Sequence, residues 1–140
     1  MMQHDDTSGT RKDLVLYRLE TAKEDLESAR ILYANKSYKG ANNRAYYSIF
    51  HTVNAILALD GKAYRRHKDV IANFNKDYVH TGIFPKDLGR KISKAEEIRH
   101  ASDYDDFYIA VIADVEQLIS TAEEFLEAAE IYCINRLNEL

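Results

Sequence analysis

The stretch SYKGANNRAYYSIFHTVNAIL, residues 37–57, decides the fold of this chain. It lacks proline, contains one glycine, and carries apolar side chains at helical spacing. Ser37 can act as the N-cap, and the Asp60-Gly61 dipeptide is a strong signal for the end of a helix. The stretch therefore predicts one long helix over residues 38–59.

One edge of this predicted helix is polar. At about 100° per residue, four side chains lie away from the aliphatic face, and they are Arg44, Tyr47, His51 and Asn54. In a functional interpretation, arginine binds phosphate with a fork of donors and histidine transfers protons near neutral pH. In a structural one, the arginine lies along the surface, the tyrosine packs against a neighbouring helix and the histidine makes a structural hydrogen bond. Both interpretations stay open.

The rest of the chain predicts four further helices. The two long terminal segments place apolar residues at alternating spacings of four and three, which is typical of a helix with one buried face. Pro85 opens the fourth helix, and the acidic run SDYDD is expected to form a turn that caps the last one. The four segments are 10–35, 67–78, 85–102 and 106–136. The fold class is therefore all-α, an antiparallel bundle of four to five helices.

The composition limits the function further. The 140 residues suit one domain, which we place at residues 10–138 after a flexible N-terminus of residues 1–9. The net charge of −4 does not favour nucleic-acid binding by the molecule as a whole. Cys133 stands alone, so neither a disulfide framework nor a thiolate metal site is expected. No apolar run approaches the roughly 20 residues of a membrane span, and the polar start resembles no secretory signal. We expect a cytoplasmic protein without metal, cofactor or membrane anchor.

Residues 37–57 strongly resemble the second helix of the HEPN (higher-eukaryote and prokaryote nucleotide-binding) superfamily. The run KDVIANFNKDYVHTGIFPKDLGRKISKAEEIRHASDYDDF, residues 68–107, resembles the rest of a small prokaryotic HEPN protein. The resemblance implies a helical bundle that usually dimerises. It also implies a kinship with metal-independent endoribonucleases of toxin–antitoxin and other defence systems. Such proteins are often paired with a minimal nucleotidyltransferase, MNT, which in some pairs attaches AMP to a tyrosine of the HEPN toxin.

The family's catalytic motif is an arginine followed by a histidine after about four to six residues, near the start of the last long helix. Two copies meet across the dimer to form one site. Arg99 fits the arginine and His100 fits a polar position, but Tyr104 stands where the shortest spacing requires histidine. The usual site is incomplete. An alternative is that Arg99 forms a local ion pair with Asp103, Asp105 or Asp106.

Arg44 and His51 satisfy the motif's spacing at another place in the chain. With nine arginines and five histidines, chance predicts about one such match, so the spacing alone carries little information. The second and fourth helices could still bring the polar edge to Arg99 and supply the missing histidine. The predicted catalytic residues are Arg99, His51 and Arg44, and the predicted ligand-binding residues beside them are Tyr47, His100 and Tyr104.

The segment KAYRRHK, residues 62–68, is the most basic cluster in the chain. Its charges and rings would suit RNA phosphates and bases, and Arg65, Arg66 and His67 are the predicted contacts. A solvated loop is the alternative.

Three functions follow, in order of preference. The first is the HEPN component of a toxin–antitoxin or defence-type pair, which binds nucleotide or RNA and works with an MNT nucleotidyltransferase. The second is an active endoribonuclease with an altered arginine–histidine site. The third is a dimerisation module without a ligand. A homodimer is expected in each case.

Overall fold

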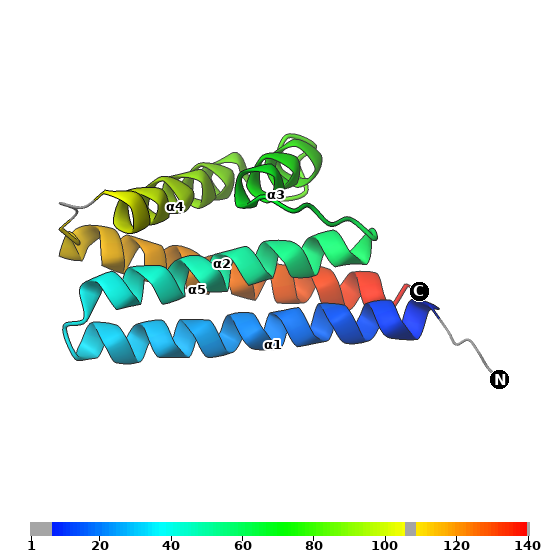
Figure 1. Ribbon diagram of the computed structural model, residues 1–140. Coiled ribbons are helices and arrows are strands. Elements are labelled where there is room, and N and C mark those ends of the chain that lie inside the picture. The colour runs from blue at the N-terminus through cyan, green and yellow to red at the C-terminus, as the bar shows by residue number, and fades with distance from the viewer. Residues whose placement is uncertain (1–6, 106–108, 140) are drawn as a thin grey trace.

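The structure is a computed structural model that describes residues 7–105 and 109–139. In these residues it contains α-helices and one π-helical segment, with no strand. Three long helices form the body of the bundle: α1 (Thr7–Ala34), α2 (Tyr38–Leu59) and α5 (Ile112–Leu137). The other elements lie together on one side of this body (Figure 1), and they are α3 (His67–Phe74), the π-helical segment η1 (Asn75–Val79) and α4 (Lys86–Tyr104). The predicted all-α bundle is confirmed.

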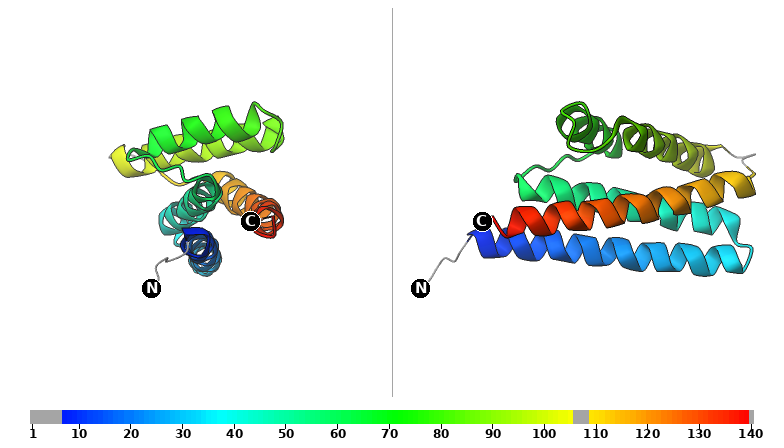
Figure 2. Two further views of the ribbon diagram at one scale, coloured as in Figure 1. Left: turned by 90° about the vertical axis from the view of Figure 1, so that its right-hand side faces the viewer. Right: turned by 180° about the vertical axis from the view of Figure 1, so that it is seen from behind.

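The connections explain this arrangement. A short turn, with Lys36 at a positive φ of 63°, joins α1 to α2 as an antiparallel hairpin. Helix α5 runs parallel to α2 and antiparallel to α1, so both ends of the described chain lie at the same end of the bundle (Figures 1 and 2). Helix α2 is central, since it contacts α1, α3, α4 and α5. Elements far apart in the sequence therefore meet around α2.

The core follows the predicted apolar faces. On α2, Tyr46, Ile49 and Val53 are fully buried. The predicted stripes of the terminal helices are also buried at Val15, Leu19, Ala22, Leu26 and Ala29 in α1, and at Val115, Leu118, Ala122, Phe125 and Ala129 in α5. Burial of these side chains away from water is the main stabilising contribution to the bundle.

Helix boundaries differ from the prediction at the α4–α5 junction. Helix α4 continues to Tyr104, past the expected end at residue 102, because Arg99 and Asp103 form an ion pair one turn apart. Helix α5 begins at Ile112, and residues 109–111 are not helical. The expected start of this helix, at Asp106, lies outside the described residues. At the N-terminus, residues 1–6 of the predicted flexible segment also lie outside them, and Thr7 already belongs to α1.

The prediction of one regular helix over residues 67–78 was wrong in its last turn. From Asn75 the backbone widens into η1, and the His80 amide donates to the Asn75 carbonyl at 2.8 Å. Tyr78 and Val79 are both buried after this change. The Tyr78 hydroxyl also donates to Asp60 at the end of α2. The wider turn therefore lets consecutive side chains enter the core.

No helix in the part of the chain that the structure describes is long and apolar enough to cross a membrane.

Gly89 sets how closely α4 approaches η1. A Cβ atom built on Gly89 would lie 2.8 Å from Val79 Cγ1, whereas one on Gly40 would come no closer than 3.3 Å to the more adaptable Leu32. We expect Gly89→Ala to lower the free energy of unfolding by about 1–2 kcal/mol, because overpacking outweighs the gain in helix propensity. Gly40→Ala is expected to be neutral or stabilising. Urea unfolding of both variants checks this.

A double-mutant cycle with Val79→Ala then tests the mechanism. Gly89→Ala should cost less in the Val79→Ala background, since the clashing methyl is gone. A stabilising effect of Gly89→Ala in the original chain would contradict this explanation.

Candidate functional site

The polar edge of α2 lies where the helical wheel places it. Tyr46 and Ile49 point into the core with no exposed surface, whereas Arg44, Tyr47 and His51 are half-buried at the surface. The edge is free to be polar because the aliphatic and small residues of α2 fill its contacts with α1 and α5. The edge then faces two sets of neighbours, α1 on one side and the α3–α4 pair on the other.

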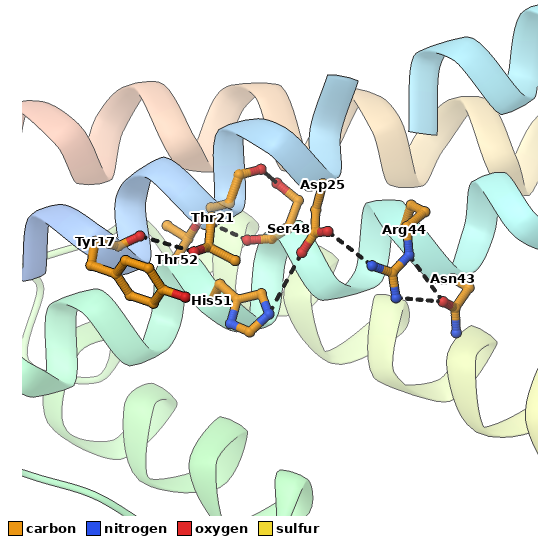
Figure 3. A network of polar contacts seen from close by, with 9 residues as sticks. Tyr17, Thr21, Asp25, Asn43, Arg44, Ser48, His51 and Thr52 are labelled. Atoms are coloured by element: carbon orange, nitrogen blue, oxygen red, sulfur yellow. Dashed lines mark hydrogen bonds and ion pairs between the residues drawn. The ribbon is translucent and has the colours of Figure 1, made fainter. Parts of the chain in front are cut away.

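Asp25 of α1 holds two of the predicted residues together. Its carboxylate lies between Arg44 and His51 (Figure 3), with 2.9 Å from Arg44 Nη1 to Oδ1 and 3.6 Å from His51 Nε2 to Oδ2. Asp25 is buried, and Arg44 also donates to Asn43 and lies over the ring of Tyr47. A buried carboxylate needs such a partner, since removing the arginine would leave an uncompensated charge. The Arg44 contact is therefore a structural clamp between α1 and α2.

His51 is neutral near pH 7 in this setting. Burial lowers its pKa below the ordinary value, Asp25 opposes this shift, and Arg44 and Arg18 add to it. Its 3.6 Å separation from Asp25 is longer than a hydrogen bond. These contacts favour a structural position for Arg44 and His51, and their catalytic assignment stays a prediction.

Arg99 of α4 forms a second cluster on the other side of the same edge. Its Nε lies 3.0 Å from Asp103, so the predicted local ion pair is confirmed. The guanidinium also lies over the rings of Tyr46, at 5.6 Å, and Tyr104, at 5.8 Å. Burial lowers the pKa of Arg99, but the Tyr47 hydroxyl and Asp103 raise it, and the net pKa lies above the ordinary value. Helices α2 and α4 thus bring Tyr47 and Arg99 together, whereas Arg44 and His51 contact Asp25 on the other side of the edge.

The histidine beside Arg99 is His67, at the first residue of α3. Its ring stacks on Phe50 with 4.0 Å between centroids, and its Nδ1 lies 3.3 Å from the hydroxyl of Tyr46. His67 and Arg99 line one cleft of about 410 Å³. The sequence assigned His67 to the basic loop only, since no local pattern shows that residues 67 and 99 meet.

His67 presents one free nitrogen to this cleft. The Tyr46 hydroxyl occupies Nδ1, whichever of the two donates, while Nε2 has no partner among the described residues. Burial lowers the pKa of His67, Arg99 and His51 lower it further, and Asp103 opposes them. The imidazole is therefore neutral near pH 7, and Nε2 can accept a proton in the tautomer whose Nδ1–H donates to the Tyr46 hydroxyl.

Glu96 adds a carboxyl group that sequence reasoning missed. It lines the cleft, and burial raises its pKa above the ordinary value against the opposing charges of Arg99, His100 and Lys68. A carboxyl with a raised pKa next to a neutral imidazole is an arrangement that acid–base sites use. The spacing of Glu96 and Arg99 on one face of α4 was the available signal.

The other predicted residues divide between the cleft and its surroundings. His100 lines the cleft and packs against Tyr104 with 4.9 Å between ring centroids and the rings tilted by 42°, while Tyr104 is 67% exposed. Arg66 pairs with Asp69 outside the cleft, and Arg65 is exposed without an ion pair in the described chain. Of the basic segment, His67 and Lys68 reach the cleft.

Comparison with known proteins agrees with this fold. The family model described as HEPN domain matches residues 15–132. The chain is 33% identical to a Thermotoga maritima protein named "UPF0332 protein", over 86% of this chain and 91% of that one. It is 38% identical to a Methanocaldococcus jannaschii protein named "Putative toxin MJ0605", over 61% of this chain and 64% of that one. "Putative toxin MJ0142" of the same organism is 29% identical, over 84% of this chain and 80% of that one.

The family match spans α2, α3, α4 and all the residues of both clusters, so the resemblance noted in the sequence is confirmed. The chain belongs to the HEPN domain family.

Proposed function

We propose that this protein is the HEPN component of a toxin–antitoxin pair, and that the cleft between α3 and α4 binds RNA or a nucleotide. The observation that carries the proposal is the shared cleft of Arg99 and His67. His67 supplies a histidine near Arg99, although none follows Arg99 at the spacing of the family's motif. Two M. jannaschii relatives carry the word toxin in their names, which supports the biological setting.

The chemistry of the cleft suits a phosphodiester. The planar Arg99 guanidinium provides paired donors for phosphate oxygens, and the exposed ring of Tyr104 is available for base stacking. Lys68 adds a further positive charge at the rim. A single strand of RNA offers both phosphates and open base faces to such a surface.

Cleavage of the bound RNA is the second candidate, and the pairing of His67 with Glu96 favours it. A neutral His67 can remove the proton of a ribose 2′-hydroxyl. Burial shifts Glu96 toward its protonated form, which is the form that donates to a leaving oxygen. Arg99 would stabilise the charge that develops on the phosphate between them. No metal enters this scheme.

Dimerisation is part of the proposal. At the end of α4 and the start of α5 the described chain exposes large apolar side chains, namely Tyr104, Ile109, Val111 and Ile112. Exposed apolar groups of this size mark interaction surfaces. A second copy of the chain bound there would place two clefts close together. A dimer without any ligand is the third candidate. RNA binding in the measurements below would exclude it.

Four conservative variants test the cleft. We expect Arg99→Lys and His67→Asn to weaken binding of a short single-stranded RNA about tenfold or more, since each removes a charge-assisted or aromatic contact. Arg30→Lys and Tyr17→Phe make comparable exchanges on α1, away from the cleft and from the other predicted contacts, and should leave binding unchanged. Fluorescence anisotropy measures affinity, and circular dichroism checks folding.

The same variants test cleavage. His67→Asn should lower the rate of RNA cleavage about a hundredfold, and it should relieve any growth arrest that the protein causes on expression. Loss of activity in His51→Asn, with retention in His67→Asn, would instead favour the Arg44–His51 assignment. If the unmodified protein neither binds nor cleaves RNA, the dimerisation module without a ligand is the candidate function that stands.

The neutral state of the histidines predicts a pH dependence of stability. His51 and His67 both have lowered pKa values in the folded protein, so the unfolded chain binds more protons below its histidine pKa of about 6.5. The contribution of these histidines to the free energy of unfolding should therefore be complete above about pH 6.5. It should decrease as the pH drops toward about 5. Urea unfolding should show a shallower fall for His67→Asn, and the shallowest for the His51→Asn/His67→Asn double variant. An unchanged slope would contradict buried, neutral rings.

A partner nucleotidyltransferase of the MNT type is the remaining part of the proposal. Tyr104 offers an exposed hydroxyl next to Arg99, while Tyr17 is equally exposed on α1, away from that cleft. Coexpression with the adjacent gene should add the mass of AMP to the intact protein. Tyr104→Phe should abolish this addition, and Tyr17→Phe should not. An unmodified mass, or an addition lost in Tyr17→Phe, would contradict the assignment.

A further inference from the structure

A second hollow lies along α4, next to the Arg99 cleft. It has a volume of about 700 Å³ and opens between η1 and the first half of α4. Asn75 and Val79 line it from η1, and Gly89 and Ser93 line it from α4. Glu97 lines both this hollow and the Arg99 cleft, so the two adjoin along one helix. We call the hollow the η1–α4 groove.

The rim of the η1–α4 groove is basic in an otherwise acidic protein. Lys86, Arg90 and Lys94 follow one another at intervals of four residues, so they lie in a row with a rise of about 6 Å per step. Lys86 and Lys94 form no ion pair or hydrogen bond within the described residues, and Arg90 pairs only with the exposed Asp87. Arg99 lies about 20 Å farther along the α4 axis than Lys86, on a different face of the helix.

The floor of the groove is polar and irregular. The Asn75 amide donates to the Ser93 hydroxyl at 3.0 Å, while its Oδ1 is buried without a hydrogen-bond partner. A buried acceptor of this kind calls for an explanation, and π-helical turns occur frequently at functional sites. Gly89 keeps the floor open, because any side chain there would collide with Val79.

We propose that the η1–α4 groove binds the phosphates of an RNA strand whose other part occupies the Arg99 cleft. The inference rests on the proposed function, and it names the ligand as a strand rather than a single nucleotide. The length of the basic row carries this choice, since three cations in line exceed what one nucleotide can reach. The unpaired state of Lys86 and Lys94 supports it further, because these side chains are available to replace counterions.

Glu97 opposes the strand at the junction of the two hollows. Its carboxylate is exposed and forms no ion pair in the described chain, so it repels a phosphate that passes from the groove to the cleft. Replacing it with glutamine removes the charge and keeps the shape. Glu97→Gln should therefore strengthen the binding of a long strand, which a merely structural residue would not do.

The experiment compares a dinucleotide with a single-stranded RNA of about 12 nucleotides, each with a fluorescent label. The Lys86→Ala/Lys94→Ala variant should bind the long strand roughly tenfold to thirtyfold more weakly at about 0.1 M salt, with a salt slope smaller by about 1.4. It should bind the dinucleotide like the original protein. The Lys12→Ala/Lys39→Ala variant removes the same charge from exposed positions of α1 and α2 and should change neither affinity.

Three outcomes separate this inference from the proposed function. If the Lys86→Ala/Lys94→Ala variant keeps its affinity for the long strand while Arg99→Lys loses it, the groove proposal fails and the cleft stands. If Lys12→Ala/Lys39→Ala weakens binding equally, the attraction is general and the groove proposal also fails. If Arg99→Lys and His67→Asn bind both RNAs normally, the cleft assignment fails by itself. Glu97→Gln should gain affinity relative to Glu24→Gln, an exposed control on α1.

Discussion

The structure depends on the burial of α2, which contacts all four other α-helices. A helix with so many neighbours needs small and aliphatic side chains on most of its surface, and α2 provides them at Ala41, Ala45, Ile49, Val53 and Ile56. Polar groups are then confined to one edge. That edge must satisfy its hydrogen bonds against α1 and against the α3–α4 pair, because buried polar groups without partners are costly. The Asp25 and Arg99 clusters along this edge are consequences of this constraint.

The same constraint accounts for the position of His67. Tyr46 is fully buried, and the hydroxyl of a buried tyrosine needs a partner. The imidazole of His67 provides one, at 3.3 Å, and Phe50 holds the ring by stacking. A contact that stabilises the core thus fixes Nδ1 and leaves Nε2 toward the cleft. At His67, the same contacts that pack the core also fix the position of the ring in the cleft.

Most of the fold could be predicted from the sequence, because periodicity is a local property. The bounds of α2 and the buried stripes of α1 and α5 followed from spacing and turn residues. The caps did not follow, because the Ser37 side chain makes no capping hydrogen bond and Val111, rather than the acidic run, is at the N-cap of α5. The π-helical turn at Asn75 and the start of α5 at Ile112 did not, since tertiary packing decides them. Of the clusters, the meeting of Tyr47 with Arg99 was foreseeable from the family's helix order. The contacts of Asp25 and His67 were not, because they join residues that no short pattern connects.

The distribution of charge affects how an RNA ligand would approach the molecule. A net charge of −4 repels nucleic acid at long range, so any affinity for RNA must come from local arrays that lie close to the phosphates. The described chain offers such an array at Lys86, Arg90 and Lys94 of α4, while the ion pairs between α1 and α5 neutralise other cations such as Lys23 and Arg30. An acidic body with this local basic array favours a ligand that approaches α4 in one orientation. The electrostatic field of the whole molecule would then favour the approach of RNA to α4 and oppose it elsewhere.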